Sequence, residues 1–128
     1  MDAVATDHAP HTEAEKARGF REAPFGVVGL ETAVPLVLDR LVRPGLLPLG
    51  RAVAALSTAP ARLLGLRAKG RVAAGADGDL TLLDLERDAA VDKTRFESKG
   101  RNTPFDGWAL KGAPVMTIVG GRVVFPFD

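Results

Sequence analysis

Hydrophobic and polar positions divide the chain near Arg67 into a helical first part and a β-rich second part. Residues 2–6 form a short β-prone run that stops at polar residues. Between residues 30 and 41, apolar side chains recur at helical spacing and predict one amphipathic helix. Pro35 lies inside this stripe and cannot donate a backbone hydrogen bond, so we expect the helix to begin near Thr32.

Three other helices are indicated by their start and stop signals. Thr12 and Glu15 have the spacing of a capping box, in which each side chain satisfies a backbone amide at the start of a short helix. Another helix is expected to begin near Pro48. A last one is expected to be capped by Thr58 and to end at Gly65. The first part is therefore expected to be helical after its initial strand.

The part of the chain after Arg67 has the pattern of short strands separated by glycine. We expect strands at residues 70–72, 79–84, 115–119 and 122–125. Gly120 and Gly121 join the last two, and a two-glycine link closes a β-hairpin through positive φ angles. Together the two parts predict a mixed α and β fold.

The amino-acid composition limits the classes of protein to which this chain can belong. The 128 residues are 46% hydrophobic and 26% charged, which is ordinary for a globular segment. Seventeen basic and sixteen acidic residues are interspersed, so nothing favours a nucleic-acid or membrane partner. The sequence has no cysteine and no stretch of roughly 20 apolar residues, and its N-terminus does not resemble a secretory signal. A cytoplasmic location is expected.

Asp7, His8 and His11 follow the first predicted strand directly. In (β/α) barrels, catalytic and metal-binding groups lie at the C-terminal ends of strands. A carboxylate and two imidazoles in a loop are nevertheless more often a cap, a turn or a surface patch than a metal site. The cluster alone therefore leaves both interpretations open.

The wider motif is more specific. Residues 6–13, read with Ala-Pro-Phe-Gly at 23–26 and Gly-Leu-Glu at 29–31, closely resemble the last-strand signature of dihydroorotases in the amidohydrolase superfamily. The resemblance continues through residues 57–61, 70–72, 75–80 and 102–105. It covers nearly the whole chain and implies an α/β fold, namely the C-terminal fragment of a metal-dependent (β/α)8 barrel. Residues 1–67 would supply the last barrel strand, the substrate loop and closing helices, and residues 68–128 the β-rich tail of a small composite sandwich.

The resemblance implies reversible hydrolysis of (S)-dihydroorotate to N-carbamoyl-L-aspartate, in pyrimidine biosynthesis. Asp7 would bind one zinc of a binuclear centre, accept the proton of the attacking hydroxide and protonate the leaving nitrogen. His11 would contact the substrate carboxylate, and the backbone amides of Phe25 and Gly26 would form a second anion-binding element. Without the motif, His11 is equally a flank of the capped helix and Phe25 a core residue in a tight turn. His8 is expected to have a supporting role. Four other charged residues are expected to be solvated or salt-bridged surface groups, and Trp108 is expected to be a packing anchor: the four are Lys16, Arg18, Arg21 and Glu31.

The family's other metal ligands are absent from this sequence, including the His-x-His pair of its first barrel strand. A full barrel needs about 250 residues, so the chain resembles a truncated piece and isolated activity is not expected. The expected partners are a small anionic substrate, the missing N-terminal barrel portion and further copies of the chain. Two alternatives stay open: a non-catalytic module that binds aspartate transcarbamoylase, and another cyclic amidase such as a hydantoinase or allantoinase.

Overall fold

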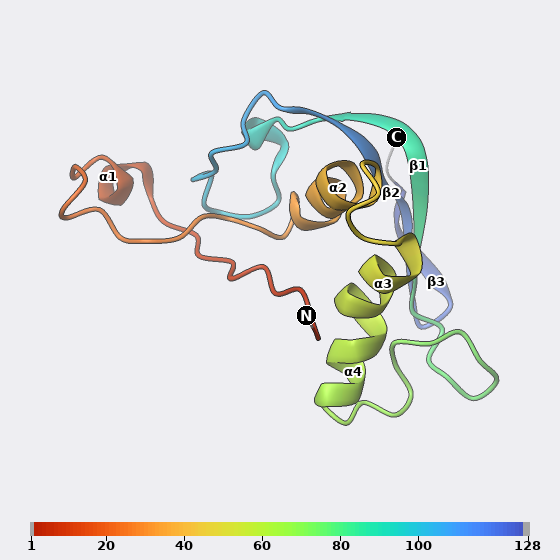
Figure 1. Cartoon of the computed structure of the whole chain (residues 1–128). Helices are drawn as coiled ribbons and strands as arrows, with labels where there is room; N and C mark the ends of the chain where they lie inside the picture. The colour runs from red at the N-terminus through yellow and green to blue at the C-terminus, as the bar shows by residue number, and fades with distance from the viewer. Residues whose placement is uncertain (1, 127–128) are drawn as a thin grey trace.

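The computed structural model describes residues 2–126, which form a set of helices packed beside a three-stranded antiparallel sheet. A looped arm carrying the first helix projects to one side of this body (Figure 1). The helical elements are α1 (Glu13–Lys16), α2 (Ala33–Val37), η1 (Leu38–Val42), α3 (Leu49–Val53), η2 (Ala54–Thr58), α4 (Ala59–Leu63) and η3 (Lys93–Arg95). The strands are β1 (Leu80–Ala90), β2 (Ala109–Val119) and β3 (Arg122–Pro126).

The strand predicted at residues 2–6 does not form. This segment has no strand pairing, and its backbone joins the helices through one hydrogen bond, from Val4 N to the carbonyl of Ala55 at 2.9 Å. A strand requires a neighbouring strand to satisfy its backbone donors and acceptors. Within residues 2–126 the three strands pair only with one another, so the segment runs along the helices unpaired.

The capping box of α1 is confirmed. The Thr12 side chain accepts a hydrogen bond from the Glu15 amide, while the Glu15 carboxylate accepts one from Thr12 N at 2.8 Å. The start predicted for the next helix is confirmed as well, because α2 begins directly after Thr32. Pro35 is then in the first helical turn, where its missing N–H removes no hydrogen bond.

The prediction that Thr58 caps a separate helix is wrong. α3, η2 and α4 follow one another without a break, and Thr58 has helical dihedral angles of φ −63° and ψ −43°. Its hydroxyl instead donates to the carbonyl of Gly70 at 2.7 Å, which ties the helix to the loop that follows. Gly65 does lie just beyond the C-terminus, with φ +69°, as predicted.

The sheet has the order β1-β2-β3, and the predicted hairpin is confirmed. Gly120 and Gly121 have φ of +56° and +77°, which suits the tight turn between β2 and β3. The strand expected at 79–84 forms as part of β1, whereas residues 70–72 remain a loop, so that prediction is wrong. No partner strand within residues 2–126 faces this loop.

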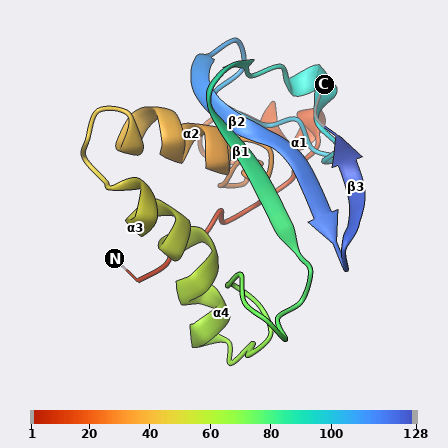
Figure 2. The same cartoon turned by 90° about the vertical axis from the view of Figure 1, so that its right-hand side faces the viewer.

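Helices pack on one face of the sheet, with α2 and η1 beside β2 (Figure 2). Gly112 permits this approach, since a Cβ there would lie 3.0 Å from the Cβ of Leu38. The side chain of Asp39 then accepts a hydrogen bond from the backbone N of Lys111 at 2.9 Å. The close approach at Gly112 and polar links such as this one thus hold helix and sheet together.

The buried core is small for a chain of this length. Its main cluster comprises Val28, Val91, Phe96 and Leu110, with Leu36 and Phe105 packed against it, and other buried apolar residues lie in the helices and in β2. The described residues expose 8844 Å², whereas a compact monomer of 13.5 kDa exposes about 6,500 Å². Large apolar side chains lie on the surface of the helices and of the sheet. The fold therefore leaves apolar faces uncovered.

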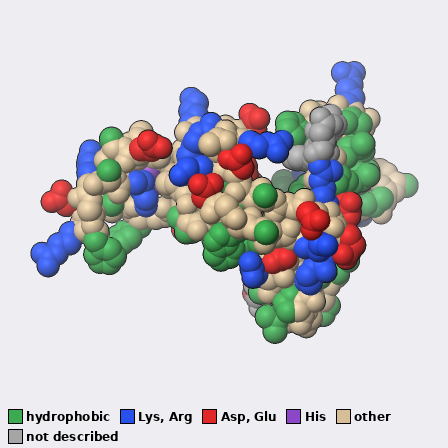
Figure 3. Space-filling model, turned by 90° about the horizontal axis from the view of Figure 1, so that it is seen from above, with side chains coloured by type: hydrophobic (Ala, Val, Ile, Leu, Met, Phe, Trp, Pro, Cys, Tyr) green, Lys and Arg blue, Asp and Glu red, His purple; other side chains and the backbone are tan. Residues whose placement is uncertain are grey.

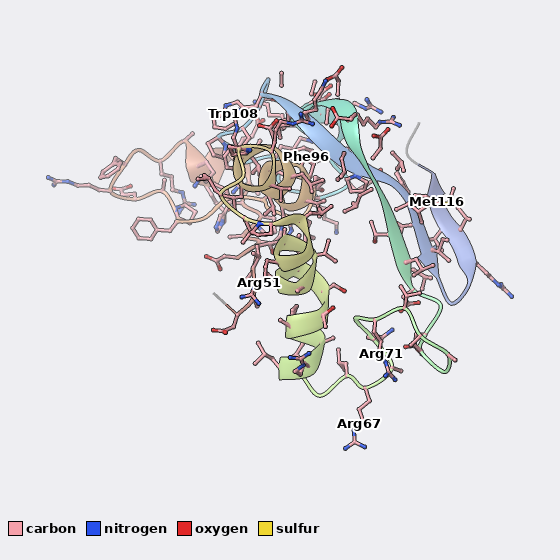
Figure 4. The ribbon with its side chains drawn as sticks, turned by 45° about the vertical axis from the view of Figure 1, so that its right-hand side comes forward. Arg51, Arg67, Arg71, Phe96, Trp108 and Met116 are labelled. Atoms are coloured by element: carbon pink, nitrogen blue, oxygen red, sulfur yellow. The ribbon has the colours of Figure 1, made fainter. Side chains whose placement is uncertain are left out.

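The surface shows no single-sign block on the face seen from above, where acidic and basic side chains are intermixed (Figure 3). Trp108, expected to be a packing anchor, is 40% exposed. Arg67 and Arg71 extend from the loop after α4 (Figure 4). The Trp108 ring meets Phe105 edge-on at 5.1 Å, and the Arg40 guanidinium lies 5.0 Å from its centre. No helix within residues 2–126 is long and apolar enough to cross a bilayer.

Candidate active site

Two loops that are distant in sequence lie side by side in the arm around α1: residues 7–11 and residues 23–29 (Figure 1). The backbone N of Ala9 donates to the carbonyl of Val27 at 2.9 Å. Gly26 has φ +96°, and a Cβ at this position would lie 2.5 Å from the Cβ of Ala9. Only glycine allows both the backbone conformation and the close approach.

Asp7 has an unusual backbone conformation. Its φ is +46°, the only positive φ among the non-glycine residues that the structure describes. Side chains of L-residues pay roughly 1–2 kcal/mol for the left-handed region, although Asp tolerates it better than most. Its carboxylate is exposed and has no hydrogen-bond or ion-pair partner within residues 2–126. A strained residue with a free carboxylate fits a functional role.

His8 connects the first loop to the second. Its Nδ1 accepts a hydrogen bond from the backbone N of Gly29 at 3.2 Å, so the proton of the neutral ring is on Nε2. Gly29 also packs tightly against the first segment, because a Cβ there would lie 2.9 Å from the carbonyl oxygen of Thr6. His8 thus holds the end of the residue 2–6 segment against the second loop.

Glu31 lies near His8 and joins this region to the C-terminal half. Its Oε1 accepts a hydrogen bond from the backbone N of Ser98 at 2.8 Å, and its Oε2 is buried without a partner among residues 2–126. Burial acts to raise the pKa of Glu31, but hydrogen bonds, chiefly from Ser98, hold that pKa below its ordinary value. The expectation that Glu31 is a solvated or salt-bridged surface group is therefore wrong.

His11 makes two contacts that fix its position. Its ring Nε2 donates to the carbonyl of Phe25 at 3.0 Å, and its backbone N donates to the Oδ1 of Asn102 at 3.0 Å. The Phe25 side chain is 93% exposed, so the alternative in which it fills the core is wrong. The structure thus brings His11 and Phe25–Gly26 together, while Asp7 lies at the start of the same loop without touching His11.

Lys16 and Asn102 were not singled out as site residues by the sequence. Lys16 was expected to be a surface charge, but its Nζ donates to the carbonyls of Pro24 at 2.9 Å and Gly26 at 3.1 Å. Asn102 lies far along the chain, yet its side chain reaches both loops. The only sequence signal for Asn102 was its presence in a motif that extended the family resemblance.

The described residues do not form a metal centre by themselves. No group of three His, Asp or Glu side chains within residues 2–126 could hold a metal ion. His8 Nδ1 accepts from the Gly29 amide, whereas His11 Nε2 donates to the Phe25 carbonyl and leaves His11 Nδ1 without a partner within residues 2–126. Together with the exposed Asp7 carboxylate, this offers too few ligands for a metal pair.

Comparison with known proteins agrees with the motif. The model of the amidohydrolase family matches residues 6–125. The chain is 53% identical over 125 residues to proteins named dihydroorotase from Bacillus caldolyticus and from Geobacillus kaustophilus, covering 98% of this chain and 29% of each relative. It therefore spans under a third of the length of these relatives.

Solved structures share the fold. An L-hydantoinase from Arthrobacter aurescens matches with a TM-score of 0.92 and 39% identity, over 98% of this chain and 29% of that one. A D-hydantoinase from a Thermus species matches with a TM-score of 0.89 and 31% identity, over 98% and 28%. Because the family model matches nearly all of the residues that carry the two loops, their glycines and the sheet, this chain belongs to the amidohydrolase family.

Proposed function

We propose that this chain is the C-terminal part of a dihydroorotase, which hydrolyses (S)-dihydroorotate reversibly to N-carbamoyl-L-aspartate. The observation that carries the proposal is the junction of the two loops, where His11 Nε2 lies 3.0 Å from the carbonyl oxygen of Phe25. It joins the residues that the dihydroorotase motif assigns to substrate binding. The 53% identity to dihydroorotases, against 39% to the L-hydantoinase, favours dihydroorotate over hydantoins.

The fold proposal divides the chain at residue 67. Residues 1–67 would supply the last strand of a (β/α)8 barrel, the substrate loop and closing helices, and residues 68–128 the tail of a small β-sandwich. Two features support this division. The extended segment at residues 2–6 has no strand partner within the described chain, and the exposed surface is larger than that of a compact monomer. Both features would be explained if an N-terminal barrel portion covered this surface.

Asp7 is proposed as the proton carrier. Zinc, which the family implies, would supply a water that loses its proton near neutral pH, with Asp7 as this chain's ligand to it. The Asp7 carboxylate would take a proton from the attacking water and then pass it to the ring nitrogen as the amide bond breaks. Its exposed carboxylate, which no described neighbour occupies, supports this role.

Binding of the substrate carboxylate is proposed for His11 and for the backbone amides of Phe25 and Gly26. The carbonyls of Pro24 and Phe25 are held by Lys16 and His11, and all described peptide bonds are trans. In a trans peptide the N–H points opposite to the carbonyl of the same peptide unit, so the N–H groups of Phe25 and Gly26 point away from Lys16 and His11. Neither N–H makes a hydrogen bond within residues 2–126. Two free amides suit an anionic group.

The test joins the preceding portion of the Bacillus caldolyticus dihydroorotase to residues 2–128 of this chain. We expect this chimera to hydrolyse dihydroorotate with zinc, and to lose activity with a chelator or with Asp7→Asn. Neither the 128-residue chain alone nor hydantoin as substrate should give turnover. A correctly folded, zinc-loaded chimera without activity would contradict the proposal.

Two features of the intact protein are also proposed: a cytoplasmic location, and assembly of several copies through the uncovered apolar faces. The alternative proposal is that the chain belongs to a non-catalytic module that binds aspartate transcarbamoylase. The alternative is distinguished by the same chimera, because a module of that kind would bind the transcarbamoylase in a pull-down without hydrolysing dihydroorotate.

A further inference from the structure

Asn102 makes hydrogen bonds to both candidate substrate loops at once. Its Oδ1 accepts from the backbone N of His11 at 3.0 Å, across 91 residues of sequence. Its Nδ2 donates to the carbonyl of Ala9 at 2.9 Å and to the carbonyl of Gly26 at 3.3 Å. One side chain from the segment between η3 and β2 thus bridges the loop at residues 7–11 and the loop at residues 23–29.

The chemistry of this position requires an amide. A primary amide carries one acceptor oxygen and two N–H donors in one plane, and all three are used here. The partners also fix its orientation, because a backbone N–H can only donate and the two carbonyls can only accept. A carboxylate at this position would place an acceptor against two carbonyl oxygens, and a hydroxyl could donate to only one of them.

The bridge is anchored to the core. The backbone carbonyl of Asn102 accepts from the N of Val28 at 3.0 Å, and Val28 is fully buried. The preceding residues lie close to the first loop as well, since a Cβ at Gly100 would lie 2.7 Å from the Cβ of Pro10. Asn102 therefore connects both loops to the buried core.

We propose that Asn102 is a positioning residue for the substrate-binding groups, acting through His11 and Gly26 without touching the substrate. The part of this inference that concerns substrate rests on the proposed dihydroorotase function. The geometric part of the inference is that Asn102 fixes the position of the two loops relative to each other. This part does not depend on the proposed function. Loss of the Asn102 side chain should loosen the two loops relative to each other, although the direct hydrogen bonds from Ala9 N to Val27 and from His11 Nε2 to Phe25 remain.

The geometric part is tested on the 128-residue chain by amide hydrogen exchange measured by NMR. In Asn102→Ala the His11 amide should exchange about 3–10-fold faster, because its acceptor is gone. Asn102→Asp keeps that acceptor, so exchange at His11 should stay closer to the original rate. The Val28 amide bonds to a backbone carbonyl that both variants retain and should be unchanged. Lys99→Ala, an exposed site on the same segment, is the matched control.

Unchanged exchange at His11 in Asn102→Ala would overturn the inference. If the Asn102→Ala chain instead loses exchange protection at all its amides, Val28 included, the test relies on the Asn102→Asp chain. An equal loss of protection at His11 and at Val28 in this variant would reduce Asn102 to a general stabilising residue and would also overturn the inference.

The substrate part is tested in the active chimera. Positioning of binding groups should raise KM for dihydroorotate about 10-fold in Asn102→Ala while kcat changes little, because uniform binding is lost. A merely structural defect would lower the active fraction, and hence apparent kcat, at constant KM. An inactive chimera with normal Asn102 would defeat the proposed function but leave the exchange result standing. An active chimera with an unchanged KM in the variant would overturn the positioning role alone.

Discussion

Gly26 and Ala9 approach each other so closely that a Cβ added at Gly26 would lie 2.5 Å from the Cβ of Ala9. Gly26 also has φ +96°, a conformation that side chains of L-residues rarely adopt. The contact occurs where the two candidate substrate loops meet. A single methyl group at this point must therefore push the loops apart.

Gly26→Ala should destabilise the chain more than Gly19→Ala does. Gly19 has a similar φ of +87° but no atom within 4 Å of its added Cβ, so it isolates the backbone strain of roughly 1–2 kcal/mol. The clash at Gly26 should add about 1–3 kcal/mol. Urea unfolding of both variants measures the difference, and equal losses would contradict the close approach.

Lys16→Met should loosen the second loop. The Nζ of Lys16 donates to two carbonyls, and hydrogen bonds from a charged donor are worth about 1.5–3 kcal/mol when buried and less at this half-buried site. Lys99→Met removes the same charge from an exposed side chain that has no polar partner within residues 2–126. We expect a loss of about 1–2 kcal/mol only for Lys16. Matching stabilities of the two variants would show that the Lys16 contacts contribute nothing.

Asp7→Gly should be more stable than Asp7→Ala by about 0.5–1 kcal/mol, although both should be inactive in the chimera. The reason is the φ of +46°, which glycine adopts without strain and alanine does not. At Asp2, which lacks a positive φ, glycine should bring no such advantage over alanine. Denaturant midpoints of the four variants give the comparison. An alanine variant at residue 7 as stable as the glycine variant would argue against strain.

Glu31 should contribute stability that depends on pH. Burial disfavours its charge, yet hydrogen bonds, chiefly from Ser98, outweigh burial and lower the pKa of Glu31 in the folded state. A lowered folded pKa means that the charged form stabilises the fold above the unfolded pKa of about 4.3, and that this contribution disappears as pH falls below it. The free energies of unfolding of the original chain and of Glu31→Gln should therefore differ most at pH 7, and the difference should shrink as pH falls through the folded pKa.

The matched control for this prediction is Glu97→Gln, at an exposed carboxylate of the following segment. Its effect on stability should be small at neutral and at acidic pH. A difference between the original chain and Glu31→Gln that grows on acidification would reverse the sign worked out above and refute the prediction.

Local features of the fold were predicted correctly because their causes lie within a few residues. The Thr12–Glu15 capping box, the start of α2 before Pro35 and the turn at Gly120–Gly121 each follow from neighbouring backbone groups. Three predictions failed where partners were needed. Residues 2–6 and 70–72 lack a neighbouring strand in the described chain, and Thr58 gives its hydroxyl to Gly70 rather than to a helix start.

The candidate site also contains residues that the sequence identified and residues that only the structure identified. Asp7, His11, Phe25 and Gly26 were singled out by a contiguous motif, and their catalytic and binding roles remain proposals. Lys16 was expected to be a surface charge because nothing in the adjacent sequence indicates that the loop folds back and brings the Pro24 carbonyl to its side chain. Asn102 was seen only as part of a motif, since its partners are more than 70 residues away.

By itself the sequence determined the family, the residues worth testing and the short-range elements, because residue type and spacing act locally on backbone hydrogen bonds. Only the tertiary structure decided how the two loops are held together. The amide of Asn102 and the ammonium of Lys16 bind backbone carbonyls, and every residue presents a carbonyl. Side-chain identity therefore carries no information about which carbonyl such a donor will meet, and that choice follows from the folded path of the chain.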